Sequence, residues 1–378
     1  MKKIKVSFLL CLFFYIPFSL ANFDALIDTI KKRDLPGAKA LIEEGLIDIN
    51  SKDSNGKTVL HLVSSFFIDG VSFARYFVKE HGIDIDSKDS EGKTALHWAT
   101  YMGNKNLAKY LVGLGADIHL KDSKGRTVLH FAVFSGEIDL VKYFVKLGAD
   151  VKARTKNGNT VLHWAAASRF SLWKQDILRY LVINGAKQEI NLQNNYGITV
   201  LHMLASNPRD FRSLSYLVEA QGANIHLKDV DGNTILHEAS SSNWNLPTIK
   251  VLVRANIDIN AKNKYGATAL HFASELSGLD KPFHHLSWSK RTFLTKSYNY
   301  IDYRLDVIKY LIREGIDIQA KDKNGKTALD LVSTKGDLDS SIFSFLQDVY
   351  RKQAEMEKKE GNLVSRFRKV CHKIFSQK

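Results

Sequence analysis

One short phrase, Gly-x-Thr-x-Leu, recurs along almost the whole chain and constrains the fold more than any other feature. Its first seven threonines follow one another at spacings of 33 to 39 residues, and the last follows after 59. A nearly fixed period of this size is typical of a solenoid, in which each repeat buries its apolar face only against its neighbours. The sequence therefore predicts one elongated domain of repeats in place of several globular ones. The threonines are Thr58, Thr94, Thr127, Thr160, Thr199, Thr234, Thr268 and Thr327.

Each repeat is expected to form a turn followed by two helices. In residues 89–120, Gly92 supplies the turn, and Thr94 is placed to cap a helix because its hydroxyl can accept hydrogen bonds from backbone N–H groups at the helix start. Apolar residues then recur at spacings of three and four, which predicts a second helix that ends at Gly115. These apolar residues are Leu107, Tyr110, Leu111 and Leu114.

The fuller phrase, Gly-x-Thr-[Val/Ala/Ile]-Leu-His with a following Gly-Ala-Asp-Ile, resembles the ankyrin repeat over residues 22–350. The resemblance implies an all-α solenoid of stacked helix-turn-helix repeats with short β-hairpin turns. This sequence has Val, Ala or Ile where the family has Pro after the Thr, which removes a pre-set backbone angle but keeps the cap. Tetratricopeptide repeats have a similar period, but the turn residues and the Thr-x-Leu-His phrase disfavour them.

The ends of the array and one insertion depart from the pattern. Residues 23–32 and 36–44 are expected to form an N-terminal cap pair, and the eighth repeat has Asp330 where the others have His, which suits a terminal repeat. The seventh repeat contains an insertion at residues 276–304 with six aromatic residues. Burying one such side chain contributes about 1.5–3 kcal/mol. We therefore expect the insertion to pack on the seventh and eighth repeats around Trp288 and Phe293; the alternative is that a partner covers its aromatic residues.

Residues 1–21 have the layout of a secretory signal peptide, with a cationic start, an apolar run and small residues before a cleavage point at Asn22. A membrane anchor is the alternative, but even residues 6–20 number fifteen and include Pro17, short of the ~20 that span a bilayer. Cleavage would remove Cys11 and leave Cys371 alone, so no internal disulfide is expected. The prediction is an exported chain, periplasmic or secreted.

The formal net charge of +14 suggests nucleic acid or an anionic membrane as a partner. Most of the charge lies outside the repeats: +3 in the signal, +6 in residues 351–378 and +3 in the insertion, which leaves about +2. The sequence thus assigns the basicity to the appendages. Residues 363–375 form an amphipathic segment, expected either to lie on an anionic membrane or a partner, to fold back over the final repeat, or to fray.

The sequence contains no strong catalytic or metal-binding motif. Seven of the thirteen histidines occupy the same place in the phrase, and helices packed about 8–10 Å apart would not bring them to one zinc ion, whose ligands lie at about 2.0–2.3 Å. The resemblance implies that each hydrogen-bonds its own Thr and the adjoining turn. His284 and His285 lie in the insertion without a nearby Cys, and phosphate-loop, nucleophile-elbow and paired-Cys patterns are absent. We expect neither an enzyme nor a cofactor. The seven are His61, His97, His130, His163, His202, His237 and His271.

The resemblance implies a non-catalytic protein-binding scaffold that holds its partner on a concave surface. In ankyrin repeats the contact residues are the two before the turn Gly, the one after it, and those at the exposed end of the first helix. Aromatic residues and charges of both signs at these positions favour a protein partner over a nucleic acid, and a monomer is expected. The matching residues are Ser90, Glu91, Lys93, Tyr101, Met102, Ser123, Lys124, Arg126, Phe134, Lys156, Asn157, Asn159, Tyr196, Ile198, Asp231, Asn233 and Tyr265.

A second hypothesis is that the basic tail at residues 351–378 binds an anionic membrane or nucleic acid, with the repeats as a spacer. A bacterial-type signal ahead of ankyrin repeats also resembles proteins that host-associated bacteria export toward eukaryotic partners. This analogy suggests an exported effector and does not name its partner.

Overall fold

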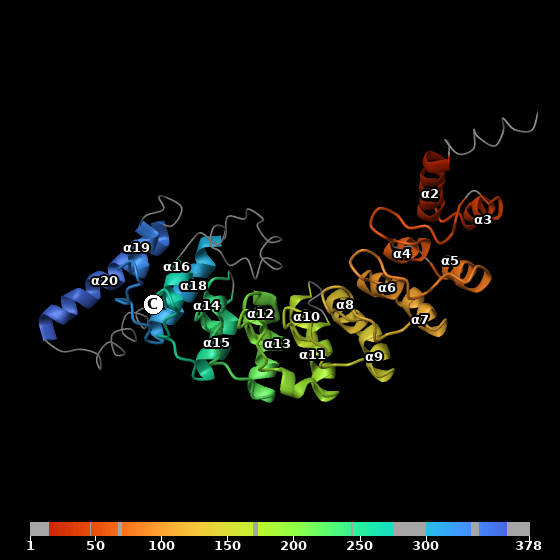
Figure 1. The fold of residues 1–378 in the computed structure, drawn as a ribbon. Helices are drawn as coiled ribbons and strands as arrows, with labels where there is room; N and C mark the ends of the chain where they lie inside the picture. The colour runs from red at the N-terminus through yellow and green to blue at the C-terminus, as the bar shows by residue number, and fades with distance from the viewer. Residues whose placement is uncertain are drawn as a thin grey trace, which may run out of the picture. The chain divides into compact units, whose positions relative to one another are not determined.

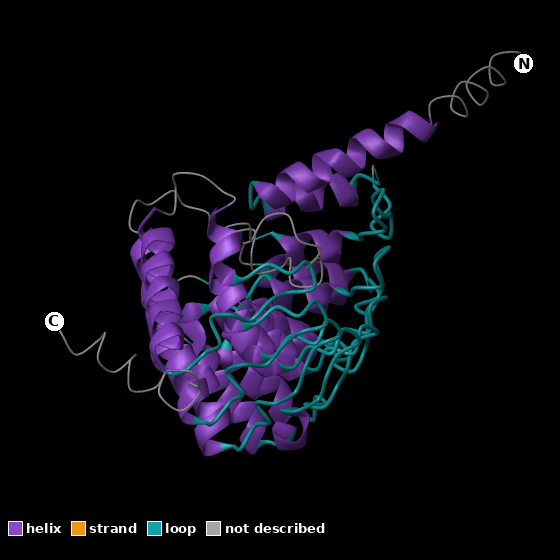
Figure 2. Ribbon diagram, turned by 90° about the vertical axis from the view of Figure 1, so that its left-hand side faces the viewer, coloured by secondary structure: helices purple, strands orange, loops and turns teal. Residues whose placement is uncertain are grey.

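The computed structural model describes residues 15–45, 47–66, 70–168, 173–242, 245–274, 300–333 and 340–360. These residues form helices joined by turns and contain no strand, with an isolated backbone bridge between Lys228 and Thr234 in one hairpin turn (Figure 1; Figure 2). The expected all-helical solenoid is confirmed. The chain divides into two compact units, which we call unit 1 (residues 1–157 and 168–173) and unit 2 (residues 158–167 and 174–378).

Unit 1 begins with a helix pair that lacks the repeated phrase, and three repeats follow. The first helices of these repeats, α4, α6 and α8, pack against one another in order. The pairs are α2 (Tyr15–Lys31) with α3 (Leu35–Glu43), α4 (Val59–Ser65) with α5 (Val71–Arg75) and the π-helical η1 (Tyr76–Glu80), α6 (Ala95–Tyr101) with α7 (Lys105–Gly113), and α8 (Val128–Ser135) with α9 (Ile138–Lys146).

Unit 2 contains the other five repeats. Their first helices, α10, α12, α14, α16 and α19, again pack in order. The groups are α10 (Val161–Ala167) with α11 (Lys174–Ile183) and η2 (Ala186–Glu189), α12 (Val200–Ala205) with η3 (Pro208–Asp210), α13 (Phe211–Ser215) and η4 (Tyr216–Ala220), α14 (Ile235–Ser240) with α15 (Leu246–Arg254), α16 (Ala269–Ser274) with α18 (Tyr300–Arg313), and α19 (Ala328–Ser333) with α20 (Ser340–Glu360).

The phrase Thr-x-Leu-His starts the first helix of the first seven repeats with a capping box. At α4, the backbone N–H of Thr58 donates to Nδ1 of His61 at 3.2 Å, and the Thr58 hydroxyl lies 2.8 Å from the same nitrogen. Because Nδ1 accepts, the ring proton is on Nε2, which donates to the carbonyl of Lys93 in the next turn at 2.9 Å. His163 and His237 make the corresponding bonds to the following turns at 2.9 and 3.0 Å. His202 and His271 do so at 3.3 and 3.1 Å, so the expected bond to the next turn is confirmed for five of the seven histidines.

The last repeat keeps the helix cap of this arrangement but not the bond to a following turn. Oδ2 of Asp330 accepts from the backbone N–H and from the hydroxyl of Thr327, both at 2.8 Å. A carboxylate caps the helix as well as the imidazole does, but it has no second N–H to offer to a following turn. The substitution of Asp for His therefore fits a repeat that ends the array.

The leucine of the phrase forms the core of each repeat. Leu60, Leu96, Leu129, Leu162 and Leu201 are each at most 1 % exposed, as are Leu236 and Leu270. Full burial of one such side chain contributes about 1.5–3 kcal/mol. These positions face the neighbouring first helices, so the packing of one repeat depends on the next.

Seven of the eight turns that precede a phrase are organised by one Asp or Asn, and the turn before Thr160 has Thr155 at that position. Oδ1 of Asp89 accepts backbone N–H groups from Glu91 and Lys93, both at 2.9 Å. Gly92 has φ +73°, and a Cβ atom there would lie 2.8 Å from the backbone nitrogen of Ser123 in the next turn, so only Gly fits. The same acceptor geometry recurs at Asp53, Asp122, Asn194, Asp229, Asn263 and Asp322.

A buried ion pair joins the fourth and fifth repeats. Nζ of Lys174, at the start of α11, donates to the carbonyl of Ala166 at the end of α10 at 2.9 Å and pairs with Oδ2 of Asp210 at 2.6 Å. Both side chains are only 1 % exposed. Lys174 thus donates to a carbonyl in the last turn of α10, where helix carbonyls generally lack an intrahelical partner.

Two other repeats with long connections use the same solution. Nδ2 of Asn245 donates to the carbonyl of Ala239 at 3.1 Å and to that of Ala205 at 2.5 Å. Arg304 donates from Nε and Nη2 to the carbonyl of Ala273 at 3.0 and 2.5 Å. In these three repeats a buried polar side chain therefore donates to a carbonyl near the end of the first helix.

Several expectations fall outside the described residues: the signal before residue 15, the insertion between residues 275 and 299 with its histidines and the Trp288 and Phe293 contacts, and the tail after residue 360. Helix α2 starts at Tyr15 and continues through the predicted cleavage point between Ala21 and Asn22. Helix α20 extends to Glu360, so the predicted boundary at residue 350 lies inside a helix. Within the described residues, no helix is both long and apolar enough to cross a membrane.

Candidate functional site

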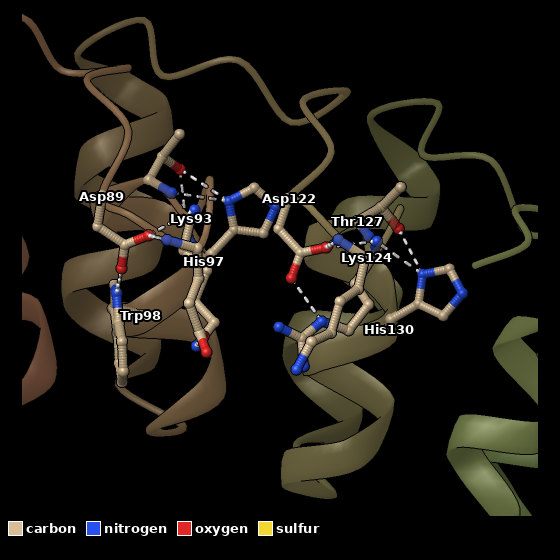
Figure 3. Close-up of polar contacts among 11 residues, drawn as sticks. Asp89, Lys93, His97, Trp98, Asp122, Lys124, Thr127 and His130 are labelled. Atoms are coloured by element: carbon tan, nitrogen blue, oxygen red, sulfur yellow. Dashed lines mark hydrogen bonds and ion pairs between the residues drawn. The ribbon is translucent and has the colours of Figure 1, made fainter. Parts of the chain in front are cut away.

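The hairpin turns of unit 1 form a row, which we call the turn edge (residues 52–57, 88–93, 121–126 and 154–157). The backbone N–H of Ser123 donates to the carbonyl of Glu91, and that of Lys156 donates to the carbonyl of Lys124, both at 2.9 Å. Each turn is thus hydrogen-bonded to the one before it, in addition to its internal bonds (Figure 3). The side chains at the tips are therefore carried on a fixed backbone.

Trp98, on the first helix of the second repeat, is held against the turn edge on several sides. Its indole N–H donates to Oδ2 of Asp89 at 2.8 Å (Figure 3). The ammonium groups of Lys57 and Lys93 lie over the ring, 3.8 and 4.3 Å from its centre, where the cation–π attraction favours them. Lys93 also forms a short ion pair with Glu91. The ring and both cations are thus ordered before any partner arrives.

An aromatic cluster continues from Trp98 along the ends of α6 and α8. The ring of Tyr101 stacks on that of Phe134, with centres 5.9 Å apart and planes at 8°. Trp98 and Phe131 meet Tyr101 edge-on at 6.2 and 5.9 Å. Tyr101 remains 42 % exposed, whereas Phe131 is 1 % exposed and belongs to the core. The structure therefore brings the predicted contact residues Tyr101 and Phe134 together.

Unit 2 has a different patch, at the tips of its turns. Tyr265 is 54 % exposed, and its hydroxyl donates to Oδ1 of Asp231 at 3.3 Å. Val230, 41 % exposed, donates its backbone N–H to the carbonyl of Tyr196 at 3.0 Å. The sequence pattern predicted Tyr196, Asp231 and Tyr265 as contact residues but not Val230. An apolar residue two positions before the turn Gly is the signal that could have identified Val230.

Arg126 was predicted to contact a partner, but its side chain is buried, with 8 % of the residue exposed. Its Nε donates to Oδ2 of Asp122 at 2.5 Å, and its guanidinium lies 4.9 Å from the centre of the Phe131 ring. The position after the turn Gly points back toward the first helix, where long side chains fold over the core. In this conformation Arg126 is a structural residue of the turn.

Ile198 and Asn233 occupy the same position in later repeats and are also buried, at 4 % and 0 % exposure. The Asn233 side chain donates to Oδ2 of Asp229 at 3.0 Å and accepts from Nδ2 of Asn263 at 2.8 Å, which joins two turns. The expectation that these two side chains meet a partner directly conflicts with this burial. These two side chains are instead buried within the array of repeats.

The remaining predicted contact residues are accessible to different degrees. Asn159, half-buried, accepts from Nδ2 of Asn194 at 2.7 Å. The exposed residues are Ser90, Glu91, Tyr101, Ser123, Lys124, Lys156, Asn157 and Tyr265. The half-buried residues are Lys93, Met102, Phe134, Asn159, Tyr196 and Asp231.

Burial keeps three of the phrase histidines uncharged at neutral pH. Burial lowers the pKa of His97, His202 and His237 to about 4, because the cationic ring would lose its hydration. Each ring nitrogen Nδ1 already accepts from its own Thr. Among the described residues, no group of three or more His, Cys, Asp or Glu is placed to hold a metal ion.

Comparison with known proteins identifies the repeat. The chain matches the family model described as ankyrin repeats (3 copies) at residues 26–122, 114–194, 171–263 and 201–286. Curated relatives include a probable serine/threonine-protein kinase of Dictyostelium discoideum, 27% identical over 189 residues (46% of this chain, 22% of the relative). The NF-kappa-B p105 subunit of Gallus gallus is 37% identical over 93 residues (24% of this chain, 9% of the relative).

A third relative is phosphocholine transferase AnkX of Legionella pneumophila, 30% identical over 161 residues that make up 43% of this chain and 15% of AnkX. The chain thus matches less than a quarter of the length of each of these relatives. The family model, by contrast, covers residues 26–286, more than half of the chain. With the capping boxes and stacked helix pairs, this match shows that the chain belongs to the ankyrin-repeat family.

Proposed function

We propose that this chain is a non-catalytic scaffold that binds a partner protein on its hairpin turns and the exposed ends of its first helices. The observation that carries the proposal is the ring of Tyr101, 42 % exposed yet fixed by stacking on Phe134. Tyr and Trp dominate the energetics of protein interfaces. A side chain that is already fixed loses little conformational entropy when a partner covers it.

The second patch, in unit 2, supports the same function. Tyr265 and Val230 are exposed at turn tips whose backbone is hydrogen-bonded to neighbouring turns. Family membership favours a protein partner, because ankyrin repeats typically act in protein–protein interaction. The names of two relatives denote enzymes, but this chain matches only 22% and 15% of their lengths. Catalysis is therefore no part of the proposal.

Paired substitutions test the scaffold. Loss of both Tyr101 and Phe134 in a Tyr101→Ala/Phe134→Ala variant should weaken binding of partners on unit 1 at least tenfold, in line with the ~2 kcal/mol or more of interface hot spots. Ile183→Ala is the control, since Ile183 is 74 % exposed on the outer helix α11. Cross-linked partners of each variant would be quantified by mass spectrometry. The scaffold proposal fails if the paired variant and Tyr265→Ala both keep every partner of the unaltered chain.

Export is a separate part of the proposal. The cationic and apolar pattern of residues 1–21 supports a secretory signal, and an exported ankyrin-repeat chain, periplasmic or secreted, would meet its partner outside the cytoplasm. Fusion of residues 1–25 to alkaline phosphatase, which is active only after export, tests this in a bacterial host. Activity that persists when two apolar residues, Leu9 and Leu10, are changed to Asp would contradict a signal function.

A further inference from the structure

The charge of unit 1 is concentrated on its turn edge. These segments contain nine Lys or Arg and four Asp or Glu. The near-neutral sum over all repeats had suggested that the basicity belongs to the appendages; the structure instead collects cations along one row of turns. The three unit 2 turns that carry Tyr196, Val230 and Tyr265, residues 193–198, 228–233 and 262–267, hold three Lys and two Asp, a smaller excess of cations.

The acidic residues of the turn edge are already engaged within the fold. Asp89 is buried and accepts from two backbone N–H groups and from Trp98. Asp122 is buried against Arg126. Glu91 pairs with Lys93, whose hydrogen bond and charge lower the pKa of the Glu91 carboxyl. The field presented to a partner is therefore cationic, with Lys124 and Lys156 exposed at successive tips.

The aromatic cluster beside these cations favours a protein ligand over a nucleic acid. Bases bind by stacking on open aromatic faces. Here Lys57 and Lys93 lie over the Trp98 ring, and Phe134 covers one face of Tyr101. What remains accessible is the exposed part of Tyr101 next to a row of ammonium groups, a combination that suits an apolar side chain flanked by carboxylates.

We propose that the turn edge of unit 1 binds an acidic segment of the partner protein, with an aliphatic or aromatic side chain of that segment packed on Tyr101. The inference rests on the proposed scaffold function and specifies its ligand. Lys57, Lys124 and Lys156 meet the carboxylates, and the Tyr101–Phe134 stack supplies the apolar contact. The patch of unit 2, whose turns carry a smaller excess of cations, should show a weaker preference.

Selection of peptides tests the ligand class without knowledge of the natural partner. Random 12-residue peptides displayed on phage are selected against the full chain, and enriched peptides are synthesised and measured by fluorescence anisotropy. The expected peptides exceed the library in Asp and Glu, contain an apolar residue, and bind more weakly as salt rises. Lys57→Gln/Lys124→Gln/Lys156→Gln should weaken their binding about tenfold, at about twofold for each exposed ion pair lost.

The control removes the same charge elsewhere: Lys32→Gln/Lys146→Gln/Lys187→Gln, all exposed residues outside the hairpin turns between repeats, should bind like the unaltered chain. Equal weakening by both triple variants, or peptides without an acidic excess, overturns the inference. If the selected peptides have no acidic excess but Tyr101→Ala/Phe134→Ala abolishes their binding, the scaffold function still stands. If none of these substitutions, nor Tyr265→Ala, affects the binding of the selected peptides, the result contradicts both the scaffold function and the acidic-ligand inference. Tighter binding of a 12-nucleotide oligouridylate, lost in the turn-edge variant, would overturn the choice of a protein ligand.

Discussion

Lys174 shows how a buried charged side chain can supply a hydrogen bond at the end of a helix. Burial lowers the pKa of Lys174 and raises that of Asp210, so both charged forms are disfavoured by their surroundings. Their mutual ion pair and the bond to Ala166 offset this desolvation. A buried ion pair of this kind contributes little net stability, but each partner depends strongly on the other.

A pair of substitutions is expected to reveal this dependence. Lys174→Met leaves the Asp210 carboxylate buried without its cation and should lower the free energy of unfolding by about 3–5 kcal/mol. Lys174→Met/Asp210→Leu should recover most of the loss, less about 1–3 kcal/mol for the unsatisfied Ala166 carbonyl. Urea denaturation followed by circular dichroism measures both. A double variant no more stable than the single one would contradict the account.

Individual phrase histidines are also expected to make the folded state sensitive to acid. An unfolded chain protonates histidine near pH 6.5, whereas folded His97, His202 and His237 do so at about 4. The unfolded state thus binds protons first as the pH falls, so the free energy of unfolding should decline from about pH 6.5 to about pH 4, by at most roughly 3 kcal/mol per histidine. Urea midpoints at pH 8, 6, 5 and 4 measure the decline. It should be shallower in His202→Asn; an unchanged slope there would exclude His202 as a source.

At the scale of helices, the second helices are joined by cations that lie over aromatic rings of the next repeat. Arg179 of α11 lies 5.1 Å from the centre of the Tyr216 ring, in the second helix of the following repeat. The sequence already shows a basic residue directly before many of these tyrosines, but only the stacking geometry pairs it with the ring one repeat further on. The other pairs are Lys39 with Tyr76, Arg75 with Tyr110, Lys109 with Tyr143, Lys250 with Tyr310 and Lys309 with Phe345.

A double-mutant cycle on Arg179 and Tyr216 measures this coupling. Arg179→Ala, Tyr216→Leu and the double variant should give an interaction energy of about 0.5–1 kcal/mol from denaturation midpoints. Arg179→Lys, which keeps the charge, should retain part of it. An interaction energy near zero would mean that the ring and the guanidinium merely lie close together.

At the scale of the whole molecule, the period alone was sufficient to predict the stacked helix pairs, since Thr caps, buried Leu and turn Gly each act within one repeat. Two features of the site could not be predicted. The burial of Arg126, Ile198 and Asn233 depends on how a side chain folds over the neighbouring helix. The basic turn edge could not be seen in the net charge of the repeats, because that sum combines the turns with helices that lie elsewhere in the fold.

Truncation distinguishes the turn edge from the tail as the source of anion binding. A chain that ends at Glu360 loses five Lys or Arg and no Asp or Glu. It should keep its affinity for acidic peptides, because every cation of the turn edge remains. Loss of that affinity would transfer the function to the tail. Sedimentation with phosphatidylserine vesicles, compared for the full and shortened chains, tests the membrane hypothesis directly.

The bonds from five of the phrase histidines to a backbone carbonyl of the following turn have an evolutionary consequence. Every amino acid offers that carbonyl, so a duplicated repeat finds its acceptor wherever it is inserted, and the array can lengthen or shorten by unequal recombination. The junction between the fourth and fifth repeats is different, because His163 meets the carbonyl of Ile198 there but Lys174 also requires Asp210. Those two repeats must be inherited together, and a rearrangement that separates them would leave a buried charge behind.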